Sequence, residues 1–530
     1  MDLSFGGADN TSLVRPYVHW CNNNFDRWDH DGIFYTPEQD DQQTASQPDC
    51  NYTDNYGNRI IPCTRDLEDY ARLWLCGITS NLLAALPIGG SITLSWGDVG
   101  NPNPANPTID LFQAADPDGG IGYLTNETIA VQQTNVTLCP YIGRLGPGSN
   151  LVLNASQFGG WAGNYFIWCG VSNGTGGLTL TIADANSNTL AQTTAYIQIV
   201  DIKQMYERWT VGDNPNVAPT NTAYLVVEGL PPYTSPFQYT PPQNANTPYI
   251  LHVHGYNMQP WEKDRYAETA FKRLYWLGYQ GRFGAFNWPT YQHWWDYDLS
   301  EAQAWQSGAG LLNLLTSLNA EYPGQVYLTA HSLGNVVAGE ALRLAGPNQL
   351  VNTYVAMQAA VDSHTYDPTR PTRAVSFSTP DRYGQYYTNG APCYFNGVTG
   401  AATCVNFFNT NDWALSAIAW QADQNSKPDW GYGYNGTDFY YQPFLSRTYL
   451  YFPQNSYTIF SFCDQAHAFA VGMQPNLGGA FTTSKQVELD IPPYGFNTAH
   501  IYHSGQFRSD NPQRWQFWNQ VLVQMKLKRP

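Results

Sequence analysis

The chain has 530 residues, and 25 Lys and Arg against 42 Asp and Glu give it a net charge of −17. Because no basic surface offsets this acidity, the composition argues against nucleic acid and against an anionic membrane surface as partners. Hydrophobic residues make up 43% of the chain and charged residues only 13%, which is typical of large folded cores. No uninterrupted apolar run reaches the roughly 18 residues of a membrane helix, so we expect no membrane span.

The first 84 residues form an acidic, Asn-rich region that holds four of the nine cysteines. The stretch Arg65–Leu75 at its end has a helical pattern, so a helix is predicted there. Cysteines clustered in loop-like sequence favour disulfides, and disulfides favour a secreted or periplasmic protein. The alternative is a set of buried thiols, and an odd number of cysteines leaves at least one thiol without a partner.

The same region offers a candidate calcium site, because hard carboxylate oxygens at short spacing ahead of a helix suit Ca²⁺. The candidate ligands are Asp26, Asp29, Asp31, Asp66 and Asp69. Their spacing departs from the EF-hand pattern. The alternative interpretation is a solvated acidic loop in which Asp66 caps the predicted helix.

Residues 85–205 predict a β-sandwich-like domain, because short alternating strands follow one another with turn residues between them. The predicted strands are Ser91–Trp96, Thr108–Ala115, Tyr165–Val171, Leu178–Ala183 and Thr194–Val200. A Pro-rich passage over residues 206–247 has little periodicity and is interpreted as a linker.

From residue 248 to residue 530, apolar strands alternate with long helical stretches. The predicted strands are Tyr249–His254, Gly284–Trp288, Val326–Ala330 and Tyr354–Val361, and the predicted helices are Glu262–Leu277, Leu299–Leu318, Asn335–Leu344 and Pro512–Met525. This alternation is typical of βαβ units, so an α/β fold with a doubly wound, mostly parallel sheet is predicted.

The segment Ala330–Gly334 has the pattern of a nucleophile elbow, with Ala in place of the usual first Gly. A strand enters it and a helix leaves it, and small residues two positions before and after Ser332 allow the tight turn. Such an elbow exposes the Ser332 hydroxyl and places the Leu333 N–H at a helix N-terminus, where a developing oxyanion is stabilised.

A second oxyanion donor is expected from the loop after the strand that ends at His254. The Tyr256 N–H, which follows Gly255, is the candidate, although a turn glycine after a buried strand is the simpler alternative. His252 and His254 share one strand face, but no third metal ligand accompanies them. They are therefore interpreted as core histidines.

A serine nucleophile on this topology needs an acid and then a base later in the chain. Asp412 ends a β-rich segment and is preferred, and Asp362 directly after the preceding strand is the competitor. His503 lies just before the terminal amphipathic helix and is the preferred base. His500 is the second choice, and His467 lies in a helix-like stretch that favours packing.

Aromatic residues crowd one segment of this region and could line an acyl or aromatic pocket or pack against the sheet. The candidate substrate-binding residues are Trp288, Tyr291, Trp294 and Trp295, together with His331 beside the nucleophile. Residues 362–403 have no strong period and are interpreted as a possible lid, whose end a Cys393–Cys404 disulfide could hold.

Four motifs in this order resemble the α/β-hydrolase superfamily, and most of all a poorly characterised bacterial branch of it. The motifs are Val253–Asn257, Phe286–Thr290, Tyr297–Ala302 and His331–Asn335. The resemblance covers residues 248–346 well and 404–525 more loosely, and it does not reach the first 240 residues. It implies the α/β-hydrolase fold and serine esterase chemistry, with Ser332, Asp412 and His503 as the triad.

The sequence therefore predicts a serine hydrolase that cleaves small or polymeric carboxylic esters through an acyl-enzyme. It predicts no cofactor for catalysis, a possible structural Ca²⁺, and neither nucleic acid nor a membrane span. A lipase or polyester hydrolase is the alternative within the same chemistry. A binding or adhesion protein with a catalytically weak hydrolase fold is the alternative of another class.

Overall fold

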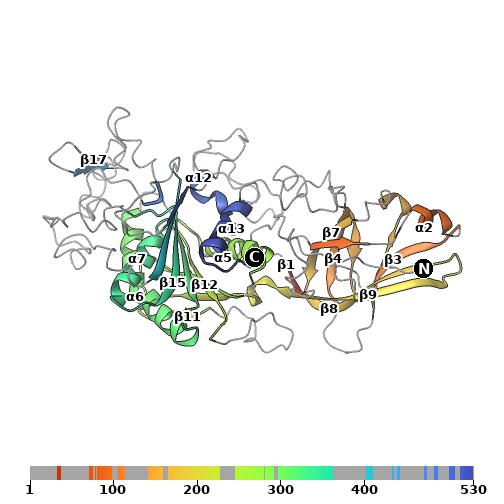
Figure 1. Cartoon of the computed structure of the whole chain (residues 1–530), viewed down its shortest axis with the longest axis horizontal. Helices are drawn as coiled ribbons and strands as arrows, with labels where there is room; N and C mark the ends of the chain where they lie inside the picture. Colours follow the sequence, from red (N-terminus) through yellow and green to blue (C-terminus); the bar gives the residue numbers. More distant parts are fainter. Residues whose placement is uncertain are drawn as a thin grey trace.

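The structure is a computed structural model, which Figure 1 shows along its length. It describes residues 33–36, 71–75, 78, 80–86, 88–97, 106–113, 141–158, 165–226, 245–279, 281–291, 297–361, 401–409, 432–434, 439–441, 471–473, 483–486, 501–507 and 514–528. Two parts lie side by side along the long axis. One is a β-sandwich, and the other is a mostly parallel sheet covered by helices on both faces.

The sandwich is made of two sheets, with strand orders β1-β9-β8-β3-β6 and β2-β7-β4-β5. Its elements are β1 (Ile33–Thr36), β2 (Ala71–Trp74), α2 (Ser80–Ala85), β3 (Ser91–Gly97), β4 (Thr108–Gln113), β5 (Tyr141–Leu145), β6 (Asn150–Leu153), η2 (Ala155–Gln157), β7 (Tyr165–Ser172), β8 (Gly174–Ala183) and β9 (Thr189–Asp201). Alternate residues of β3 are buried, which is the pattern that a sheet with one face on a core requires. The predicted sandwich is therefore present.

The N-terminal boundary of this domain differs from the prediction. The helix expected at Arg65–Leu75 is wrong over its last part, because Ala71–Trp74 is the strand β2 and pairs antiparallel with β7, and residues 65–70 lie outside the described residues. Leu73 and Leu75 are fully buried in the sandwich core, and burial on alternate positions favours a strand over the local helical pattern. Strand β1 also pairs with β9, so parts of the region before residue 85 belong to the sandwich.

The second part contains an eight-stranded sheet with the order β11-β10-β13-β12-β14-β15-β16-β19. Its strands are β10 (Glu207–Thr210), β11 (Tyr224–Leu225), β12 (Tyr249–Val253), β13 (Arg282–Asn287), β14 (Val326–His331), β15 (Val351–Met357), β16 (Ala401–Phe408) and β19 (Thr483–Gln486). All neighbours pair in parallel except the edge strand β11. The doubly wound sheet predicted from the sequence is present.

The remaining elements are the helices of this part and two further short strands. They are η3 (Ile202–Gln204), α5 (Pro260–Trp276), α6 (Tyr297–Glu321), α7 (Gly334–Ala345), β17 (Tyr432–Tyr434), β18 (Phe439–Tyr441), η7 (Val471–Met473), α12 (Ile501–Ser504), η9 (Gly505–Phe507) and α13 (Arg514–Gln524). Helices α6 and α7 pack together on one face of the sheet, and α5 and α13 pack together on the other (Figure 1).

The linker expected over residues 206–247 is partly wrong. Glu207–Thr210 forms β10 and pairs in register with Gly284–Asn287 of β13. The sheet therefore begins about 40 residues before the first strand that the sequence predicted. A strand of four residues is too short to show a recognisable alternation of apolar and polar residues, and the prolines and asparagines that follow it suggest a loop. Only its pairing with β13 identifies it.

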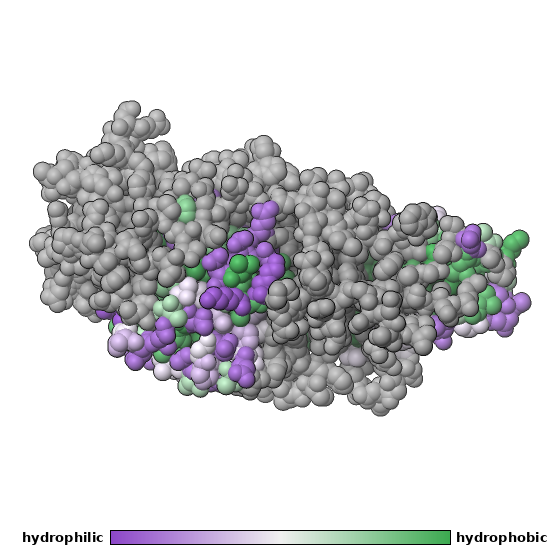
Figure 2. Space-filling view, viewed as in Figure 1, coloured by the Kyte–Doolittle hydropathy of each residue, from purple (hydrophilic) through white to green (hydrophobic). Residues whose placement is uncertain are grey.

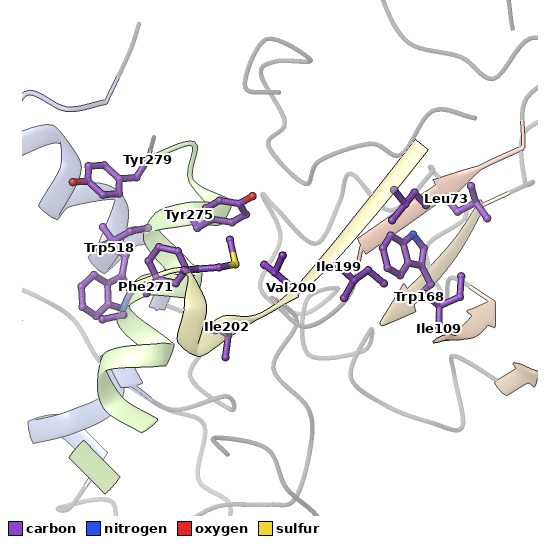
Figure 3. Packing of buried hydrophobic residues seen from close by; sticks show 14 of the residues in the cluster. Leu73, Ile109, Trp168, Ile199, Val200, Ile202, Phe271, Tyr275, Tyr279 and Trp518 are labelled. Carbon is purple, nitrogen blue, oxygen red and sulfur yellow. The ribbon is translucent and has the colours of Figure 1, made fainter. Parts of the chain in front are cut away.

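One hydrophobic cluster joins the two parts, and strand β9 leads from one to the other (Figure 3). Ile199 packs with Leu73 and Trp168 on the sandwich side. Val200 and Ile202 continue toward the side chains of α5 and α13. Because the apolar contacts do not stop at the boundary, the sandwich is attached through a core and not only through a tether.

Buried ion pairs reinforce this junction. The Lys203 ammonium, just after β9, lies 2.7 Å from the Glu268 carboxylate of α5, and the Tyr206 hydroxyl donates to the same oxygen at 3.2 Å. Burial lowers the pKa of Lys203, but the carboxylates of Glu268 and Asp264 together more than offset it, so that pKa ends above its usual value. Arg208 pairs with Asp264 on the same helix at 3.2 Å.

Cys169 and Cys404 are buried thiols. Cys404 lies inside β16 and is present as a thiol, which contradicts the suggested Cys393–Cys404 disulfide. Burial raises the pKa of this thiol to about 12. The other seven cysteines lie outside the described residues, as does all of the possible lid except Ala401–Thr403, which belongs to β16.

The surface of the sandwich exposes apolar residues at the end far from the parallel sheet (Figure 2). Ile88, between α2 and β3, is fully exposed, and Leu190 at the start of β9 is 54% exposed. Within the described ranges, no helix is both long and apolar enough to cross a membrane.

The junction predicts that Glu268→Gln destabilises the protein. The substitution keeps the side-chain shape but leaves the buried Lys203 ammonium without its carboxylate, which costs about 3–5 kcal/mol. Urea unfolding measures the loss. Asp110→Asn is the control, because it breaks an ion pair whose Arg144 side chain is 57% exposed, and such pairs contribute at most ~1 kcal/mol. Equal effects of the two variants would contradict the prediction.

Candidate active site

The candidate site lies at the carboxyl ends of β12 and β14. The direction in which successive strands are added to the sheet reverses at β12, since β13 lies on one side of β12 and β14 on the other. Ligands of open α/β sheets bind at such a switch point. Three non-glycine residues just beyond the strand ends have positive φ angles: Asn257 at 60°, Ser332 at 52° and Gln358 at 36°. Strained backbone of this kind is concentrated at functional sites.

Ser332 occupies the turn between β14 and α7, and hydrogen bonds hold its strained backbone. Its N–H donates to the Met357 carbonyl at 3.0 Å, and its carbonyl accepts from the Ala360 N–H at 3.1 Å. The Asn335 side chain donates to the same carbonyl at 2.8 Å and accepts from the Tyr354 hydroxyl at 2.6 Å. The turn is thus fixed from β15 and from the first turn of α7.

Small residues on both sides of Ser332 make this turn possible. Ala330 lies in β14 between Val253 and Ala356 of the neighbouring strands. A Cβ atom on Gly334 would lie 2.3 Å from the His254 carbonyl oxygen, so only glycine allows α7 to start this close to β12. The expectation that the elbow needs small residues at these two positions agrees with the geometry.

His503 lies in α12, far along the chain from Ser332. Its Nε2 is 2.7 Å from the Ser332 Oγ, so the hydroxyl can donate its proton directly to the ring. This is the geometry of a nucleophile and its base. Ser332 is only 4% exposed, and His503 is half-buried. The structure therefore brings together two of the three residues expected to act in catalysis.

The loop that carries His503 is fixed through Gln506, which the sequence analysis did not identify. The side chains of Gln358 and Gln506 form two reciprocal amide hydrogen bonds at 3.1 and 3.0 Å, and both residues are fully buried. The Gln506 carbonyl also accepts from the indole N–H of Trp518 at 2.9 Å and from the Arg273 guanidinium. A lone glutamine in sequence gives no signal for such a pair.

The loop after β12 is held by His254. Its Nε2 accepts from the Trp288 backbone N–H at 3.1 Å, so its proton resides on Nδ1, which donates to the Gly255 carbonyl at 2.6 Å. Burial lowers the pKa of His254 well below its usual value, and the Lys263 ammonium lowers it further. The neutral ring thus fixes the peptide between Gly255 and Tyr256, whose N–H is the candidate oxyanion donor.

The other candidate donor is the Leu333 N–H at the start of α7. Among the described residues it has no hydrogen-bond acceptor. The positive end of the α7 dipole lies at the same place, and both features favour a negative charge beside Ser332.

The three predicted substrate-binding residues that the structure describes, Trp288, Tyr291 and His331, do not gather at one surface. Trp288 is fully buried, stacks on the His254 ring at 5.3 Å and donates its indole N–H to the His254 carbonyl at 2.9 Å. It therefore packs behind the loop rather than lining a pocket. His331 is also buried. The Tyr291 hydroxyl contacts Asn216 at 3.3 Å on the exposed side.

Several predicted site residues are not among those that the structure describes. Asp412, Asp362, His500, His467, Trp294, Trp295 and the candidate calcium ligands Asp26, Asp29, Asp31, Asp66 and Asp69 lie outside the described residues. In the part of the chain that is described, no cluster of His, Cys, Asp or Glu has the arrangement of a metal site. His252 instead hydrogen-bonds Thr329 of β14 at 2.9 Å.

Residues 240–362 match the family described as "Alpha/beta hydrolase of unknown function (DUF900)". The match covers β12 to β15, including the turn that carries Ser332, but not α12, which carries His503. Together with the sheet topology it supports an α/β-hydrolase fold and a hydrolase. A search of the curated proteins found no match.

Solved structures with a similar arrangement are hydrolases of several kinds. One of two prolyl endopeptidases shares 10% identity, with a TM-score of 0.28 over 67% of this chain and 45% of its own. A metagenome-derived lipolytic enzyme shares 11% identity, with a TM-score of 0.22 over 54% of this chain and 95% of its own. Prolyl oligopeptidase B from Galerina marginata shares 11% identity, with a TM-score of 0.22 over 45% and 35% of the two chains. The chain thus spans less than half the length of the first of these, and likeness at this level assigns no activity.

The elbow geometry predicts that Gly334→Ala destabilises the protein, because backbone atoms of β12 occupy the place of the new methyl group. Overpacking of this kind costs about 1–3 kcal/mol. Thermal and urea unfolding measure it. Gly146→Ala is the matched control, since its methyl group would meet the nearest atom at an ordinary 3.5 Å. Similar stabilities of the two variants would be inconsistent with the close approach.

Proposed function

We propose that this protein is a serine hydrolase that cleaves carboxylic esters through an acyl-enzyme. The observation that carries the proposal is the 2.7 Å contact between Ser332 Oγ and His503 Nε2 at a strained elbow. A serine hydroxyl is a weak nucleophile by itself, and an adjacent neutral imidazole activates it. The α/β-hydrolase family match over residues 240–362, which include Ser332 but not His503, supports the hydrolase part of the proposal.

In the proposed mechanism His503 accepts the Ser332 proton as Oγ attacks the ester carbonyl. The oxyanion that forms is stabilised by the N–H groups of Leu333 and Tyr256. His503 then gives the proton to the departing alcohol, which leaves an acyl group on Ser332. Water activated by the same imidazole releases the acid and restores the hydroxyl.

The acid that orients His503 is proposed to be Asp412. Strand β16 lies two places from β14 in the sheet and points the same way, so the loop after it starts at the edge where Ser332 lies. Asp412 follows the end of β16 closely, whereas Asp362 follows β15. An acid hydrogen-bonded to Nδ1 would keep the His503 Nε2 unprotonated and ready to accept the serine proton.

Esters are favoured over amides on chemical grounds. An alkoxide leaves more readily than an amine, so an ester demands less from the proton transfer of His503. We therefore take p-nitrophenyl esters of short acids as the first substrates.

The proposal predicts that Ser332→Ala lowers kcat on p-nitrophenyl acetate or butyrate by about 10⁶-fold, to the level of background, as loss of a catalytic serine does elsewhere. A fluorophosphonate probe should label the wild-type protein and not the variant. The melting temperature should stay the same or rise, because removing the hydroxyl opens no cavity.

Full labelling in Ser332→Ala would show that another residue is the nucleophile. Absence of both labelling and hydrolysis in the wild-type protein would favour the binding or adhesion alternative instead.

The acid assignment predicts that Asp412→Asn lowers kcat by about 10⁴-fold, because an amide favours the wrong imidazole tautomer. Asp362→Asn serves as the matched control and should change kcat by less than about tenfold. Steady-state kinetics at pH 8 measure both. A larger loss in Asp362→Asn would move the role to the loop after β15.

A further inference from the structure

We propose that His331 is a positioning residue that fixes His503 by hydrogen-bonding its backbone carbonyl. His331 Nε2 lies 2.8 Å from the His503 carbonyl oxygen, which can only accept, so the ring nitrogen donates. The inference rests on the proposed function, since it assigns His331 a part in the same reaction. It replaces the expectation that His331 contacts substrate.

Two consecutive residues thus hold His503 at two points. Ser332 contacts the imidazole and His331 contacts the backbone of the same residue. A side chain attached only through its ring can swing with its helix, and α12 has only four residues. Because His331 also fixes the His503 carbonyl, both contacts to His503 come from the end of β14. The distance between Ser332 Oγ and His503 Nε2 is then set by that rigid end. Small displacements of a reacting group cost as much as about 10²-fold in rate.

The tautomer of His331 follows from its partners. Because Nε2 donates and burial keeps the ring neutral, Nδ1 carries no proton, and Nδ1 has no hydrogen-bond partner among the described residues. That nitrogen faces Gly255, where a Cβ atom would lie 3.1 Å from it. His331 therefore lies between the loop of the base and the loop of the candidate oxyanion donor, and a larger residue at 255 would displace it.

The ring of His331 is enclosed by aromatic residues. Phe507 lies edge-on at a centroid distance of 5.1 Å, Tyr266 of α5 lies at 6.4 Å, and the His503 ring lies at 4.9 Å. Phe507 and Tyr266 also stack on each other at 4.5 Å. This close packing restricts the movement of the ring and so supports the orientation in which it makes the hydrogen bond.

The surroundings also keep His331 neutral. Burial lowers its pKa well below the usual value, and the facing His503 and His252 lower it further. Burial likewise lowers the pKa of His252 to about 3, so His252 adds no charge near neutral pH. The groups that face His331 from β12, α5 and η9 are His252, Tyr266 and Phe507, and none of these is a carboxylate. His331 can therefore hold the backbone carbonyl of His503 without acting as a base toward the His503 ring.

Three variants test the proposal. His331→Phe keeps a ring and removes the donor, and we expect kcat to fall about 10²-fold with KM changed less than about twofold. His331→Gln places an amide N–H near the position of Nε2 and should recover kcat to within about fivefold of wild type. The rate of fluorophosphonate labelling of Ser332 should follow kcat in both variants.

His252→Phe is the matched control. His252 is equally buried on the neighbouring strand and also lies beside Phe507, at 5.6 Å, but its ring nitrogen bonds Thr329 rather than His503. If loss of kcat came only from disturbed packing, His252→Phe and His331→Phe would fall alike, and that result would overturn the inference. So would a His331→Phe variant that keeps wild-type kcat, or a His331→Gln variant no better than His331→Phe.

A measurement independent of activity separates this inference from the proposed function. In protein labelled with ¹⁵N-histidine, the protected imidazole N–H signal that is missing from His331→Gln should stay unchanged from pH 5 to pH 8. A signal that titrates in this range, or no such signal, would overturn the inference. If the signal is present but the wild-type protein neither hydrolyses esters nor reacts with the probe, the hydrogen bond stands and the catalytic role fails with the proposed function.

Discussion

The close approach of α7 to the end of β12 is the constraint on which the rest of the site depends. Gly334 lies so close to the His254 carbonyl that no side chain fits between them, and next to it Ser332 has a left-handed conformation held by bonds from β15 and Asn335. The strain raises the serine above the sheet edge and aims the start of α7 at it. A side chain at position 334 would separate the helix from the strand and remove both effects.

Around this turn, neutral buried side chains do the positioning. His254 fixes the peptide before Tyr256, the Gln358–Gln506 pair fixes the loop after α12, and His331 bonds the carbonyl of His503. Neutral hydrogen bonds suit this task, because a buried group that is hydrogen-bonded and uncharged avoids the cost of burying an unpaired charge. Charged pairs stabilise the junction, where Glu268 and Asp264 of α5 meet the segment after β9. A further pair, Lys263 with Asp213, lies behind the loop after β12, where Lys263 also donates to the Trp288 carbonyl.

Whether the sequence predicted an element correctly depends on how far apart in the chain the residues that stabilise it lie. Long periodic segments such as α6 and β14 were recognised, because their residues carry the burial pattern themselves. Residues 71–74 were predicted as helix and form a strand, and the short strand β10 was taken for linker, because pairing with β7 and β13 decides both. Local motif and chain order also singled out Ser332 and His503, whose side chains the structure places in contact.

By itself the sequence determined which residue types could do chemistry and where a strand had to meet a helix, since the small residues around Ser332 are a local requirement of the turn. The tertiary structure decided the rest. That His503 reaches Ser332 within 2.7 Å, that Trp288 packs behind a loop instead of facing solvent, and that His331 holds a backbone carbonyl depend on contacts between segments far apart in the chain. Such contacts give no periodic pattern in the sequence, because each depends on a single side chain that meets its partner only in the folded protein.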